Sequence, residues 1–211
     1  MNSCYLRFFL AWLVSVGIGC TSAPVRYYTL TAPPASSGVP VAETTFAIEV
    51  RVVHIPPQLN RSELMVRTGP TEVTLLENER WASPVNDEIK DALRIELRRR
   101  LGRVTGLRAA FTRLTLDIDV QQLEAELGQR TLLEASWSAT LLAAGEPSTA
   151  ARAITCTFQA QEPVRAGYAG IVEGYQREIA ALADAIVAVL TSPASDSDCQ
   201  KSIEGRFMNG G

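Results

Sequence analysis

Histidine, cysteine and an excess of positive charge are what this sequence has little of. Of its 211 residues, one is histidine and four are cysteine, and no Cys-x-x-Cys motif occurs. Zinc ribbons and sites built on histidine pairs need more of these residues than the chain has. The 20 Lys and Arg residues are outnumbered by 23 Asp and Glu residues, and this net charge of -3 argues against nucleic acid as a partner.

Catalytic motifs are also missing from the sequence. There is no Gly-x-Ser-x-Gly nucleophile motif and no glycine-rich phosphate loop. The single histidine, His54, stands before Ile-Pro-Pro and is expected in a loop. Asp117 and Asp119 share one face of an expected strand, but no histidine, lysine or metal ligand accompanies them, which favours solvated carboxylates. We therefore expect a protein that is not an enzyme and that uses no metal or cofactor.

The amino-terminal residues are typical of an export signal. Arg7 precedes eleven almost wholly apolar residues, Phe8 to Ile18. A membrane-spanning helix needs ~20 apolar residues, and no later stretch is long and apolar enough. The run closes with Gly19-Cys20, and a small residue before a cysteine resembles the lipobox of bacterial lipoproteins. We expect residues 1–19 to be removed and Cys20 to be lipidated, with an ordinary secretion signal as the alternative.

Alternating and helical apolar patterns predict one α/β domain, a mixed sheet with two main helices. Three strands of strict alternation are expected to form an antiparallel meander, and two strands around Thr68-Gly69-Pro70 a hairpin. The predicted strands are Tyr27–Leu30, Phe46–Val52, Glu63–Arg67, Glu72–Leu76, Leu114–Val120, Leu133–Leu141 and Ile154–Ala160. One helix is expected to begin with Ser83 as N-cap and Pro84 as first helical residue, and to end at Gly102. The second is expected from about Tyr168 to Leu190.

These patterns divide the chain into four parts. We expect a signal peptide at 1–19, a lipid anchor with a short strand and linker at 20–44, the folded domain at 45–191 and a disordered tail at 192–211. Cys156 points to the same side as its apolar neighbours, which favours a buried thiol. Pairing with Cys199 is left open, because an oxidising compartment would permit it.

Four features in chain order resemble the ABC-type transport auxiliary lipoproteins of the paraquat-inducible protein C (PqiC/YmbA) type. They are Gly19-Cys20, Tyr27-Tyr28-Thr29-Leu30, Trp81-Ala82-Ser83-Pro84 and Gly167-Tyr168. The resemblance covers roughly residues 20 to 190 and implies a three-layer α/β domain similar to anticodon-binding domains.

The resemblance implies a function as well. It implies a periplasm-facing lipoprotein, anchored in the outer membrane, that is the non-enzymatic auxiliary subunit of an intermembrane lipid transport system built on MCE-domain proteins. Thr21 after the cysteine agrees with the outer membrane, since Asp at that position marks inner-membrane retention in enterobacterial lipoproteins. The alternative is a periplasmic carrier that holds a lipid in its own cavity.

Partner contacts are expected at three places. Trp81 is expected to cover the helix start as a hydrophobic staple, with contact to a partner as the alternative. Arg98, Arg99 and Arg100 stand at the negative end of the same helix, where positive charge is favourable. The alternative is a docking patch for an acidic protein or for phosphate head groups. The third place is the Pro56-Pro57 loop. A collar around a transport channel would be a cyclic homo-oligomer.

Overall fold

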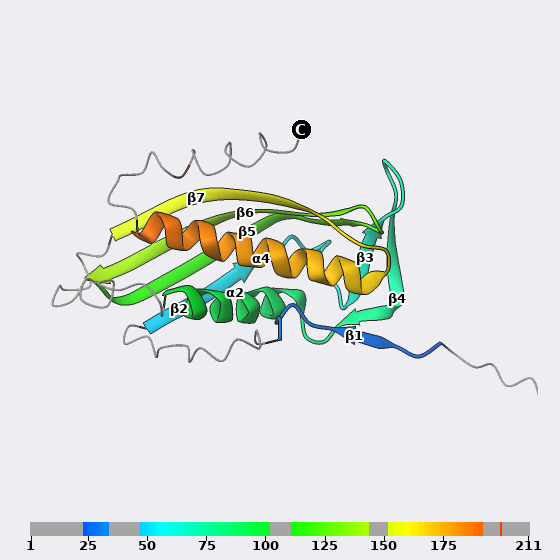
Figure 1. Ribbon diagram of the computed structural model, residues 1–211, viewed down its shortest axis with the longest axis horizontal. Coiled ribbons are helices and arrows are strands. Elements are labelled where there is room, and N and C mark those ends of the chain that lie inside the picture. Colours follow the sequence, from blue (N-terminus) through cyan, green and yellow to red (C-terminus); the bar gives the residue numbers. More distant parts are fainter. Residues whose placement is uncertain (1–22, 34–46, 102–110, 144–151, 192–198, 200–211) are drawn as a thin grey trace, which may run out of the picture.

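The computed structural model describes residues 23–33, 47–101, 111–143, 152–191 and 199. They form one seven-stranded mixed sheet and two helices, which confirms the predicted α/β domain (Figure 1). The strands are β1 (Arg26–Tyr28), β2 (Ala47–His54), β3 (Glu63–Arg67), β4 (Val73–Trp81), β5 (Phe111–Glu126), β6 (Arg130–Ala143) and β7 (Arg152–Pro163). The helices are α2 (Val85–Leu101) and α4 (Tyr168–Thr191). The signal peptide, Cys20 and the tail other than Cys199 lie outside the described residues.

The predicted meander is confirmed. β5, β6 and β7 pair antiparallel in that order. The turn between β5 and β6 contains Gly128 at φ 69°, a left-handed conformation that glycine adopts without strain. Gln129 N donates to the Glu126 carbonyl at 3.0 Å and closes this turn.

The opposite edge of β5 is shared by two other strands. β2 runs parallel to it, from the Ala47–Arg113 pair to the His54–Asp119 pair. β3 also runs parallel and joins β5 through Arg67 and Glu126. β3 and β4 form the predicted antiparallel hairpin, and β1 extends the sheet as a parallel neighbour of β4. The partners of this edge are therefore far apart in sequence, whereas the β6 side is a local meander.

Both helices lie side by side on one face of the sheet, α2 over β2 and α4 over β6 and β7 (Figure 1). The core lies between them and the inward residues of the sheet, among them Leu116, Ile118 and Trp137. The other face carries exposed polar side chains such as Thr157 and Gln159. No described helix or strand covers this second face of the sheet.

Helix α4 follows the apolar stripe expected of it, with Ile171, Tyr175 and Leu182 buried. Its backbone approaches β6 closely at Gly174. A Cβ atom there would lie 2.5 Å from the Thr131 hydroxyl oxygen, so glycine is required for this contact.

The end of β2 differs from the prediction. His54 was expected in a loop, but it is the last residue of β2 and lies opposite Asp119. A register shift between Val50 and Val52 gives the strand an extra residue, so that Val50 and Val53 are both buried. The bulge breaks the alternation, so the side-chain pattern alone ends the strand at Val52.

The start of α2 is also displaced from the prediction. Glu88 N donates to the Pro84 carbonyl at 3.0 Å, so the helix begins at Val85 and Ser83 is not its N-cap. The Ser83 hydroxyl instead donates to Glu88 Oε1 at 2.7 Å. Trp81, before this turn, is the last residue of β4 rather than part of a loop.

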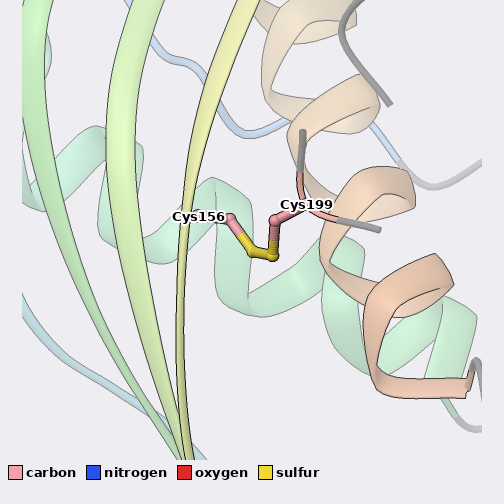
Figure 2. The surroundings of a disulfide bond; sticks show 2 residues. All are labelled: Cys156 and Cys199. Carbon is pink, nitrogen blue, oxygen red and sulfur yellow. A yellow bond between two sulfur atoms is a disulfide. The ribbon is translucent and has the colours of Figure 1, made fainter. Parts of the chain in front are cut away.

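A disulfide bond joins Cys156 of β7 to Cys199, which answers the question that the sequence left open. The Cα atoms are 5.3 Å apart, within the usual span. Figure 2 shows the bond beside α4, on the side of β7 that faces the helix. Cys156 is buried, as predicted, and the bond fixes Cys199 against the core.

Replacing Leu182 by Asp should unfold the domain. Leu182 is fully buried on α4, and an unpaired carboxylate there costs several kcal/mol against a total stability of ~5–15 kcal/mol. Ala188 on the same helix is exposed, so Ala188→Asp should cost only ~1 kcal/mol, because Asp is a poorer helix former than Ala and lies near the negative end of the helix. Urea unfolding followed by circular dichroism measures both, and a folded Leu182→Asp variant would contradict the assigned packing of α4.

Candidate partner-binding site

A groove of about 260 Å³ opens between the Pro56-Pro57 loop, the β3–β4 hairpin and β5. Half of its lining residues are apolar, and the other half carry amide or charged groups. The lining residues are Gln58, Leu59, Met65, Arg67, Val73, Gln121, Gln122, Leu123, Glu124 and Ala125. The Pro56-Pro57 loop, one of the three places expected to contact a partner, therefore borders a groove.

Trp81 supports this groove from inside the domain. A second, much smaller cavity of about 20 Å³ shares Leu59 and Met65 with the groove and reaches Trp81 and Tyr175. The Trp81 side chain is only 6% exposed, and its ring lies 6.2 Å from that of Tyr175 at an angle of 49°. The structure therefore brings Trp81 and the Pro56-Pro57 loop to one place, but it buries the indole in the core.

Local backbone geometry shapes both sides of the groove. Leu59 N donates to the Pro56 carbonyl at 2.9 Å, which folds the loop into a turn and directs the half-buried Leu59 onto the core. On β5, a register shift between Val120 and Gln122 leaves Gln121 as an extra residue. Bulges of this kind interrupt regular pairing and redirect side chains, and Gln121 is among the residues that line the groove.

An ion pair forms part of the groove wall. Arg67 of β3 donates to both carboxylate oxygens of Glu124 of β5, at 3.1 and 2.6 Å. The same guanidinium donates to the Pro70 carbonyl at 3.2 Å. Its hydrogen bonds lower the pKa of Glu124. The two opposite charges in the groove wall therefore cancel, and the ion pair holds the β3–β4 hairpin against β5.

The arginine-rich end of α2 lies elsewhere. Trp81 precedes the start of α2 and Arg98–Arg100 stand at its end, so the length of the helix, roughly 25 Å for 17 residues, separates them. Arg99 and Arg100 both form ion pairs with the buried Glu96, and Arg100 Nη2 also donates to Asp184 Oδ2 of α4 at 3.0 Å. Arg98 is exposed and has no ion pair within the part of the chain that the structure describes. Arg99 is therefore paired within α2 and Arg100 also links α2 to α4, whereas Arg98 is the one of the three without an ion pair to any described residue.

The two aspartates of β5 have different neighbours on β2, since Asp117 pairs with Arg51 and Asp119 lies opposite His54. Arg51 Nε of β2 donates to Asp117 Oδ1 at 2.9 Å, and Asp119 is exposed. Within the described ranges no three His, Cys, Asp or Glu side chains are grouped as a metal site. In the same ranges no helix has the length and apolar character of a membrane span.

Two buried carboxylates, which sequence reasoning missed, hold the amino-terminal segment on the domain. Glu88 of α2 accepts hydrogen bonds from Leu30 N at 2.8 Å and from the Thr29 hydroxyl at 2.7 Å, in addition to those from Ser83. Glu79 of β4 accepts from the Arg26 guanidinium and, at 2.6 Å, from the Tyr28 hydroxyl. Residues 26–30, which follow Cys20 in the chain, are therefore held at both ends: Glu79 binds Arg26 and Tyr28, and Glu88 binds Thr29 and Leu30.

Glu88→Ala should loosen this segment. The substitution removes the acceptor for Leu30 N and for the Ser83 backbone, and buried donors left unpaired cost ~1–3 kcal/mol each. We expect faster hydrogen exchange over residues 26–31 and a loss of stability of a few kcal/mol. Asp87→Ala is the matched control, because it removes an exposed carboxylate from the same helix turn at a cost of ~0.3–1 kcal/mol. Equal exchange in both variants would show that Glu88 does not hold the segment.

Glu178 is a buried carboxyl on α4 with no hydrogen-bond partner for either oxygen among the described residues. Burial raises the pKa of Glu178 to about 8, and the nearby Glu162 of β7 acts in the same direction. The nearby Thr131 hydroxyl is the largest influence that lowers this pKa, and Arg177 acts in the same direction as Thr131. Glu178 is therefore protonated in the folded state at neutral pH.

The free energy of unfolding should consequently fall as pH rises from about 4.5, the ordinary value, to about 8. Over this interval the folded state keeps a proton that the unfolded state releases, at ~1.4 kcal/mol for each pKa unit. Glu178→Gln should flatten the decline. Glu173→Gln, on the same helix, should not, since Arg165 lowers the pKa of Glu173 and places its effect below this range. Urea unfolding at several pH values makes the comparison, and identical slopes for wild type and Glu178→Gln would refute it.

Comparison with known proteins gives three results. Residues 28–187 match the family model described as ABC-type transport auxiliary lipoprotein component. The crystal structure of an uncharacterized protein superimposes with a TM-score of 0.60 at 18% identity, covering 80% of this chain and 100% of its own, which shows a shared fold. A Xanthomonas campestris protein of the family DUF330 has a TM-score of 0.48 at 18% identity, over 79% of this chain and 91% of its own. No curated protein matches.

Proposed function

Because this chain belongs to the family of ABC-type transport auxiliary lipoprotein components, we propose that it is a membrane-anchored, non-enzymatic subunit that docks a transport protein at its groove. The family match over residues 28–187 is the observation that carries the proposal. The groove supports the proposal. Its wall combines apolar surface with the Arg67–Glu124 ion pair, which carries no net charge, and the groove lies beside the loop expected to contact a partner.

The anchor in this proposal is a lipidated Cys20 in the outer membrane, with the domain facing the periplasm. Cys20 stands six residues before Arg26, the first residue of β1, so the domain lies within ~20 Å of the anchor at ~3.3–3.6 Å per residue. The Cys156–Cys199 disulfide supports an oxidising compartment such as the periplasm.

The proposed partner is an MCE-domain protein of an intermembrane lipid transport system, with several copies of this chain in a cyclic ring around the channel. This part of the proposal follows from the resemblance. The exposed Arg98 and the loop around Pro56-Pro57 supply candidate contacts at two ends of the domain.

The second candidate function, a carrier that stores lipid, receives less support. Sites that enclose a drug-sized ligand have volumes of ~300–1,000 Å³. The groove holds about 260 Å³ and has an ion pair in its wall, which suits contact with a protein better than burial of an acyl chain. Organic extraction of the purified protein followed by mass spectrometry tests the carrier, since stoichiometric lipid beyond the anchor would favour it.

Lipidation of Cys20 is tested by mass spectrometry of the membrane fraction. We expect an acylated amino-terminal peptide that begins at Cys20. Cys20→Ala should release a folded domain into the soluble periplasmic fraction, because the core residues of the described ranges begin at Tyr28 and Leu30, after the anchor. An unprocessed chain, or a soluble one cut elsewhere, would contradict the anchor.

Docking is tested by co-purification from detergent-solubilised envelopes. Wild type should recover an MCE-domain protein. Gln58→Arg, at the exposed rim of the groove, should weaken recovery, whereas Gln159→Arg on the uncovered sheet face should not. Arg98→Ser examines the other end of the domain without disturbing the ion pairs of Glu96. If no protein of an ABC-type transport system is recovered, the proposed function fails.

A further inference from the structure

We infer that the groove binds an extended peptide segment of the partner, which adds a short strand to the open edge of β5 over residues 120–125. This inference rests on the proposed function, in which the groove docks a protein. It names the form of the bound segment, a strand, and the main-chain groups that hold it.

The open edge follows from the pairing of β5. Along one side, β6 accompanies β5 to the Glu126–Arg130 pair. Along the other, β2 ends at the His54–Asp119 pair, and β3 joins only at Arg67 and Glu126. Between those two neighbours, residues 120–125 have no strand partner on this edge within the described ranges, and five of these six residues line the groove.

Main-chain groups on this edge are available for pairing. Alternate residues of a strand direct their N–H and C=O groups to each side. No backbone hydrogen bond from the Pro56-Pro57 loop reaches residues 120–125 in the part of the chain that the structure describes. The bulge at Gln121 removes that residue from the pairing with β6 as well. Backbone groups left unpaired in a partly apolar groove are costly, and a strand satisfies them in one step.

The size and chemistry of the groove agree with a short strand. Six residues at ~3.3 Å each span ~20 Å, the length of the gap between β2 and β3. Leu59, Met65 and Val73 line the groove with apolar surface that alternate side chains of a strand can contact. The Arg67–Glu124 pair leaves no free charge in the wall to attract an anion. The segment is therefore expected to be uncharged, with apolar side chains at alternate positions, as in other cases of strand addition.

A hexapeptide library displayed on phage and selected against the full-length chain in detergent supplies the probe. The synthetic form of a selected peptide should slow hydrogen exchange within residues 120–125. The free edge of β7, residues 152–163, is the internal comparison and should not change. N-methylation of alternate peptide amides should weaken binding by about tenfold, because it removes main-chain donors and keeps the side chains. No selected peptide, protection elsewhere or tolerance of N-methylation would each overturn the inference.

Two matched variants of β4 locate the peptide. Val73 and Leu75 are 50% and 43% exposed, and only Val73 lines the groove. Val73→Arg should weaken peptide binding by about tenfold and Leu75→Arg by no more than about twofold. Equal effects would place the peptide outside the groove.

The experiments distinguish failure of the strand inference from failure of the proposed function. If Val73→Arg abolishes peptide binding but an MCE-domain protein still co-purifies at the wild-type level, the partner contacts another surface. The strand inference and docking at the groove then both fail, while the proposed role as a membrane-anchored transport subunit stands. If both are lost and Leu75→Arg retains both, the two proposals are supported together. Failure to recover any transport protein with wild type overturns the proposed function itself.

Discussion

The hydrogen-bonding requirement of β5 determines how the rest of the domain is arranged. Over its 16 residues this strand needs partners on both edges, and β6 supplies one edge almost without interruption. The other edge is paired only in part, by β2 up to Asp119 and by β3 at Glu126. β3 places the hairpin with β4, and β4 in turn places β1. The amino-terminal segment, the hairpin and the groove thus all take their positions from one strand.

Regular side-chain patterns made most of the fold predictable. The strict alternation in β5, β6 and β7 and the apolar stripe of α4 identified those elements, because each buries a single face. Two bulges account for what the pattern missed. They place Val50 and Val53, and likewise Val120 and Leu123, on the buried side although each pair is three residues apart. The parallel pairings of β1 and β2 leave no local signal, since neither strand meets its partner through a turn.

The candidate site was predictable only in outline. Pro56-Pro57 and Trp81 pointed to its neighbourhood, but Gln121, Gln122 and Glu124 are polar and concealed the continuation of β5 along the groove. The pairing of the arginines with Glu96 could have been anticipated, because Arg99 and Arg100 stand three and four residues after it on a helix. That Glu96 is itself buried could not, since it depends on the approach of α4.

The attachment of β1 has a mechanical consequence. Tension applied through the residues before Ala23 runs along β1, whose ladder to the parallel strand β4 lies across that direction. The main-chain bonds and the Arg26–Glu79 pair therefore carry the load simultaneously, in shear, and cannot be opened one after another as in a zipper. Behind them, the contacts of Glu88 with Thr29 and Leu30 pass any remaining force to the first turn of α2. The domain is thus fastened at the end where a pull would arrive.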